Sequence, residues 1–217
     1  MLLVSCNSSK KLIKKETSDK NTTLFNIKPL EGEKESLEKE LDTYLNKLST
    51  FDTDAIVDMT YPRLFSVIDL DLYRQYIASM MNSTDIKMNS YETNVTKITP
   101  ILRFTNETEF SQVNYDTKVS INFLNDRLYN TDEKINFLYD ALVHKYGQKN
   151  IQMDVKKRIL TIRRSEKLLI IKEKGGAWKF LGDNSKYRQL YPSFLPYEIL
   201  SNLDRKQSPK KKKHKKK

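Results

Sequence analysis

Residues 113–123 alternate strictly between two kinds of side chain, and this pattern constrains the fold more than any other stretch of the chain. The six odd-numbered positions are apolar or threonine, and the five even-numbered positions are polar. Side chains of a β-strand point alternately to opposite faces, so one face of this segment is expected to be buried and the other wet. Strands of this kind are typical of an antiparallel sheet that is covered on one side.

Further strands are predicted on both sides of this segment. The alternation within residues 86–97 changes phase between Met88 and Tyr91, which indicates a β-bulge. A turn at 174–176 contains two glycines and leads into an apolar stretch, which favours a hairpin. The expected strands are residues 86–97, 100–110, 113–123, 150–156, 158–164, 167–173 and 177–181.

Helical spacing precedes the strands and interrupts them once. Leucines at spacings of three and four, from Leu37 to Leu48, form one apolar stripe on a helix that begins near Ser36. Asp52 or Asp54 is expected to cap a second helix. The expected helices are residues 36–48, 53–60, 71–80 and a long one over 131–146, with short helices within 185–203. This order predicts an α+β domain with helices packed on an antiparallel sheet.

The stretch Leu3-Val4-Ser5-Cys6 contains the only cysteine and resembles a bacterial lipobox. The resemblance implies cleavage before Cys6 and lipidation of its thiol. Only four residues precede Ser5, whereas a signal peptide needs an apolar region of about 7–15 residues. We therefore interpret residues 1–6 as the end of a lipoprotein signal peptide whose start codon lies upstream. The alternative is an ordinary apolar N-terminus with an incidental cysteine, in a cytoplasmic protein.

The formal net charge of +11 is concentrated at the ends of the chain. Seven lysines lie within Lys210–Lys217, and without them and the first twenty residues the net charge is about +1. The folded part thus has no overall basic field, and nucleic acid is not expected as a partner. Lys210–Lys217 is expected to be disordered. Two interpretations stay open: a solvated tail without a partner, or contact with anionic lipid or acidic polysaccharide that supports a lipid anchor.

Composition and charge divide the chain into four segments. The apolar fraction of 38% is enough for one domain with a real core. No apolar run approaches the roughly 20 residues that a membrane-spanning helix needs. We expect a signal remnant over 1–6, a flexible linker over 7–34, the α+β domain over 35–203 and the polybasic tail over 204–217.

Three stretches resemble uncharacterised lipoproteins of Bacteroidetes-type bacteria in the nuclear-transport-factor-2-like group: Tyr61-Pro62-Arg63-Leu64-Phe65, Gly176-Ala177-Trp178-Lys179-Phe180-Leu181 and Leu195-Pro196-Tyr197-Glu198-Ile199-Leu200. The resemblance implies a cone-like domain in which a curved sheet wraps around the long helix and leaves a pocket at its wide end. Members of the group use that pocket for catalysis, for ligand binding or for dimerisation, so the fold does not select a function.

No catalytic set is evident in the sequence. His144 is expected at the end of the long helix, and Asp116 is expected on the wet face of its strand. An isomerase of this group would need a buried carboxylate opposite a phenol. Tyr61, Tyr115 or Tyr139 could supply the phenol, but spacing identifies no carboxylate. The sequence assigns no catalytic residue, no metal ligand and no cofactor, and it leans against an enzyme.

Six aromatic residues fall on apolar faces that are expected to converge inside the cone. They are candidates for lining a pocket, with ordinary core packing as the alternative. The six are Phe65, Tyr115, Phe123, Tyr139, Trp178 and Phe180.

The sequence therefore predicts a lipid-anchored protein of the bacterial cell envelope that binds a partner or a small apolar ligand without catalysis. One alternative is an isomerase-like or hydrolase-like enzyme with a pocket carboxylate. Another is a cytoplasmic binding protein whose tail contacts nucleic acid.

Overall fold

The protein, seen here as a computed structural model, is described over residues 30–81, 86–123 and 131–203. Its α-helices are α1 (Glu33–Thr50), α2 (Thr53–Met59), α3 (Leu70–Met81), α4 (Asp132–Tyr146) and α5 (Tyr197–Leu200). Its 3-10 helices are η1 (Pro62–Ser66), η2 (Gln148–Asn150) and η3 (Ser185–Ser193). Its strands are β1 (Ile86–Ile98), β2 (Leu102–Arg103), β3 (Glu109–Phe123), β4 (Ile151–Asp154), β5 (Ile159–Lys172) and β6 (Lys179–Gly182).

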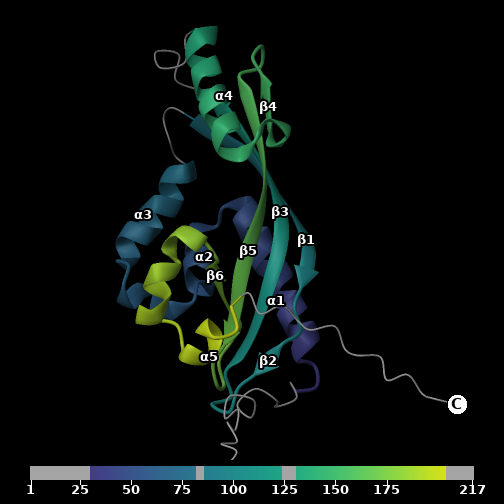
Figure 1. The fold of residues 1–217 in the computed structure, drawn as a ribbon, viewed down its shortest axis with the longest axis vertical. Coiled ribbons are helices and arrows are strands. Elements are labelled where there is room, and N and C mark those ends of the chain that lie inside the picture. The colour runs from purple at the N-terminus through teal and green to yellow at the C-terminus, as the bar shows by residue number, and fades with distance from the viewer. Residues whose placement is uncertain (1–29, 82–85, 124–130, 204–217) are drawn as a thin grey trace, which may run out of the picture.

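The strands form one six-stranded antiparallel sheet with β3 and β5 at its centre. The order is β1-β3-β5-β4, while β2 pairs with β3 and β6 pairs with β5. Because β3 occupies one edge of β5 throughout, β4 and β6 share the other edge, at Ile159–Ile162 and Leu168–Ile171. Among the described strands, none lies beside residues 163–167 on that edge. Figure 1 shows the curved sheet with most helices around one end and α4 at the other. The predicted α+β class is confirmed.

The two faces of the sheet follow the alternation of β3. We call the face that carries the odd-numbered residues 113–123 the inner face and the opposite one the outer face. Five of these six odd-numbered residues are buried, and Ile121 is the exception, whereas the even-numbered residues of the same stretch are all at least partly exposed. Alternation in the sequence therefore predicts correctly which side of this strand is covered.

The inner face carries a near cluster beneath α1 and α2. The leucine stripe of α1 is buried there against Val113, Leu168 and Ile170. The rings of Tyr44 and Phe180 stack with their centroids 4.3 Å apart and an interplanar angle of 7°. This stack joins the first helix to the last strand of the domain.

Two further clusters complete the core. A far cluster on the inner face lies under α4 and includes Phe123, Ile135 and Leu160. An outer cluster on the opposite face lies under η1, η3 and α5 and includes Phe110 and Leu169. The near end of the sheet is thus covered on both faces. Beyond the outer cluster, the outer face is open to solvent.

Several local predictions are confirmed. Asp52 caps α2 by accepting a hydrogen bond from the backbone N–H of Ala55 at 3.1 Å. Thr131 caps α4, and Gly147 follows its last residue. The register of β1 against β3 shifts between Met88 and Ser90, at the position of the predicted bulge.

Other predicted boundaries are wrong. Residues 100–110 do not form one strand, because a turn over 104–108 separates β2 from β3 and is closed by the Phe104 N–H to Thr108 carbonyl hydrogen bond at 2.9 Å. The predicted strands 158–164 and 167–173 are the single strand β5, which pairs with β3 without a break. The linker assigned to 7–34 overlaps α1, which begins at Glu33.

Candidate functional site

A groove of about 620 Å³ lies beside the sheet between α3 and η3, and we call it the α3–η3 groove. It adjoins the stretch of β5 that has no strand beside it, where β6 ends. Its size is that of a small-molecule site. Sixteen residues line it: Leu64, Ile68, Leu72, Tyr73, Tyr76, Tyr115, Glu166, Lys167, Leu181, Gly182, Asp183, Asn184, Tyr187, Leu190, Tyr191 and Phe194.

The rim of the groove presents large apolar side chains to solvent. Leu72 and Tyr76 of α3 are 64% and 62% exposed, and Tyr187 of η3 is 59% exposed. The neighbouring α3 residues Tyr73 and Ile77 pack into the core. Apolar side chains therefore cover both the buried face of α3 and the adjoining exposed face. Contiguous exposed apolar surface of this kind marks interaction sites in soluble proteins.

The floor of the groove is buried and mainly aromatic and aliphatic. Tyr115, Leu181 and Tyr191 are each less than a tenth exposed. Burial raises the pKa of the Tyr115 phenol far above its ordinary value, so this hydroxyl is neutral at physiological pH. An apolar ligand entering from the rim would therefore meet a surface that is already shielded from water.

Asp183 is the one buried carboxylate among the residues that line the groove, and its side chain is 0% exposed. Arg188 donates to it through Nε at 2.8 Å and through Nη2, and the Tyr191 hydroxyl donates at 3.2 Å. Burial, followed by the charge of Asp183, raises the pKa of Tyr191 to about 12. The carboxylate is thus held in an ion pair that fixes the start of η3, which is not the arrangement of a general base.

Two other carboxylates lie close to a group that could take part in acid–base chemistry: Glu173 is close to a phenol and Glu109 to a second carboxylate. Neither residue lines the groove. Glu173 accepts a hydrogen bond from Tyr61 at 2.8 Å, but it is partly exposed and also pairs with Arg63. Glu109 is 3% exposed, and its pKa is raised by burial and then by the charge of Glu33. Both carboxylates are thus engaged by neighbouring side chains, away from the groove.

The six aromatic candidates do not all converge at one place, because four belong to the near cluster and two to the far cluster. Phe65, Tyr115, Trp178 and Phe180 belong to the near cluster, and of the six only Tyr115 also lines the groove. Phe123 and Tyr139 belong to the far cluster. The physical reason is the length of β3: eight residues separate Tyr115 from Phe123, which is roughly 27 Å along an extended strand. Sharing a face does not bring residues together.

The structure places the other sequence candidates as follows. His144 is exposed in the last turn of α4, as expected for a helix-end histidine. Asp116 is exposed on the outer face and accepts a hydrogen bond from the Ser165 hydroxyl at 2.6 Å. Cys6 and the Lys210–Lys217 tail lie outside the described residues.

Apart from Tyr115, sequence reasoning missed the residues that form the groove. One signal was present: α3 carries apolar residues at the adjoining pairs 72–73 and 76–77, which is wider than one packing stripe. No comparable signal marks Asp183, because its partners Arg188 and Tyr191 become significant only once η3 is formed.

Comparisons with protein-family models, with curated proteins and with solved structures each gave no match. Within the described residues, no helix is both long enough and apolar enough to span a bilayer. No cluster of three or more histidine, cysteine or acidic side chains suited to a metal ion occurs in this part of the chain. Function must therefore be argued from the groove itself.

Proposed function

We propose that this protein is a lipid-anchored protein of the bacterial cell envelope that binds a small apolar ligand in the α3–η3 groove without catalysing a reaction. The observation that carries the proposal is the groove's combination of an exposed apolar rim and a buried floor. Burying a leucine-sized side chain is worth about 1.5–3 kcal/mol, so the rim alone can contribute substantially to the affinity for an apolar ligand.

The polar residues of the groove support binding more than catalysis. Asp183 is held by Arg188 and Tyr191, and Glu166 lies 3.1 Å from the Nε atom of Arg164. The carboxylate of Glu166, whose side chain is 33% exposed, can orient a polar end of a ligand while the apolar body lies against α3 and η3, whereas the buried Asp183 only fixes η3. The curved α+β sheet is also compatible with the nuclear-transport-factor-2-like family, which we retain as part of the proposal.

Replacing Leu72 by serine is expected to weaken binding of the neutral fluorescent probe N-phenyl-1-naphthylamine by about tenfold, because one rim side chain no longer covers the ligand. Leu72 is 64% exposed, so the change removes little packing from the folded protein. Fluorescence titration of the full chain gives the dissociation constants.

Phe137→Ser is the matched control, because Phe137 is a 78% exposed apolar residue on α4, away from the groove. It should leave probe binding unchanged. The function is contradicted if the native chain shows no saturable fluorescence increase, or if both variants bind the probe as the native chain does.

The lipid anchor is proposed from Leu3-Val4-Ser5-Cys6 and the polar, lysine-containing stretch behind it. We expect radioactive palmitate to label the protein when its gene is expressed from the native genomic locus. Cys6→Ser should abolish the label, since the chain has no other cysteine. A native polypeptide that starts at Met1 and carries an unmodified thiol would refute the anchor, while the groove would still be open to the fluorescence test.

A further inference from the structure

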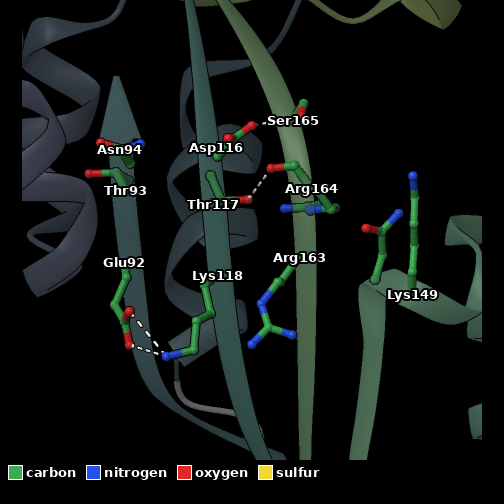
Figure 2. Close-up of a pocket in the computed structure, with 11 residues that line it drawn as sticks. Glu92, Thr93, Asn94, Asp116, Thr117, Lys118, Lys149, Arg163, Arg164 and Ser165 are labelled. Carbon is green, nitrogen blue, oxygen red and sulfur yellow. Dashed lines mark hydrogen bonds and ion pairs between the residues drawn. The ribbon is translucent and has the colours of Figure 1, made fainter. Parts of the chain in front are cut away.

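The outer face of the sheet carries a polar hollow of about 460 Å³, separate from the α3–η3 groove. Side chains from β1, β3 and β5 line it, together with Lys149 and Asn150 of η2 (Figure 2). No residue lines both the hollow and the groove. The hollow is therefore a second surface with its own chemistry.

Two rows of side chains cross the three strands in this hollow. In the first row, Asn94 is opposite Asp116, which is opposite Ser165. Asp116 accepts a hydrogen bond from Ser165 at 2.6 Å, so the carboxylate of this row has a neutral partner.

The second row is Glu92, Lys118 and Arg163. The Lys118 ammonium donates to both carboxylate oxygens of Glu92, at 2.9 and 3.1 Å. Arg163 lies directly opposite Lys118 on the other side, and Figure 2 shows its side chain extending toward that lysine. Two like charges directly opposite each other destabilise a sheet, and here the Glu92 carboxylate pairs with Lys118 alone.

Two cations at the hollow have no carboxylate partner within the described residues. These are Arg163 and Lys149, which lies on the other side of β5 in Figure 2. The guanidinium of Arg164 is compensated by Glu166 at 3.1 Å, and Lys118 is compensated by Glu92. The hollow therefore keeps a net positive charge, because the Asp116 carboxylate can offset only one of these two cations.

We infer that this hollow binds a phosphate-type anion, with Arg163 as the forked donor and Lys118 and Lys149 as additional cations. A guanidinium presents parallel N–H groups that match two phosphate oxygens, and lysines add point charges. A bound oxyanion would also relieve the repulsion between Lys118 and Arg163. The phosphate could belong to a soluble phosphate ester or to the headgroup of an anionic lipid, and the experiment below separates these sources.

The test follows backbone amide signals of the full chain by NMR during titration with inorganic phosphate at low ionic strength. We expect saturable shifts at Lys118, Lys149 and Arg163. Arg163→Gln should weaken the binding by about tenfold, because a charge-assisted bidentate contact is lost. Lys39→Gln on α1 removes the same charge from an exposed position away from the hollow, and it should leave the binding unchanged.

The two variants are then compared for binding to phosphatidylglycerol vesicles, with both carrying the same Lys210–Lys217 tail. Weaker vesicle binding by Arg163→Gln than by Lys39→Gln supports a lipid headgroup as the source. Equal vesicle binding, together with Arg163-dependent binding of inorganic phosphate, supports a soluble phosphate ester. The proposal fails if the two variants behave alike with both probes, or if native amide shifts do not saturate.

Discussion

Replacing Phe180 by alanine is expected to lower the free energy of unfolding by about 4 kcal/mol. Phe180 is fully buried on β6, and its ring stacks on Tyr44 of α1. Its backbone carbonyl accepts a hydrogen bond from the Tyr61 N–H at 2.9 Å, so the residue also anchors the segment between α2 and η1. The substitution removes the ring from a site where helix and strand meet, leaving a cavity that this rigid junction cannot easily fill.

Urea unfolding followed by circular dichroism measures this loss. Phe137→Ala is the matched control, since it removes the same ring from an exposed position on α4 and should change the unfolding free energy by less than about 0.5 kcal/mol. Equal stability of the two variants would show that Tyr44 and Phe180 do not form the stack described.

Replacing Asp183 by alanine is expected to cost about 3 kcal/mol, because one partner of a buried ion pair is removed. The Asp183 side chain has no exposed surface, whereas Arg188 retains 27% exposure and can regain part of its hydration. This partial exposure puts the expected loss at the lower end of the range for buried pairs. The variant should also bind the groove probe more weakly, since η3 loses the contact that fixes its start.

Two further variants separate the contributions to this site. Tyr191→Phe removes only the hydroxyl that donates to Asp183 and should cost about 1 kcal/mol. Asp54→Ala breaks an exposed pair with Arg74 and should change stability little. If Asp183→Ala were as mild as Asp54→Ala, the ion pair would not be what holds η3 against the groove.

Much of the fold could be predicted because its signals are local. The alternation of residues 113–123, the leucine stripe of α1 and the cap at Asp52 each depend on neighbours within a few residues. The wrong strand boundaries arose where the local sequence pattern is compatible with two different structures. Residues 100–110 are extended at both ends, and only the turn within them decides that they form two strands.

The candidate site could not be predicted in the same way. The groove brings α3, the open edge of β5 and η3 together, and more than one hundred positions separate the first of these from the last. The sequence pattern correctly assigns Tyr115 and Phe123 to the same face of β3. Because β3 is long, however, the two residues belong to different clusters. Periodicity shows which residues share a face of a strand, but it does not show which of them are close enough to form one site.

The stack of Tyr44 on Phe180 has a consequence for the order in which this chain can mature. A ribosome releases α1 long before β6, so the Tyr44 ring has no stacking partner until β6 has been made. Contacts between such distant segments also slow folding. The junction between the first helix and the last strand therefore cannot close until β6 has left the ribosome.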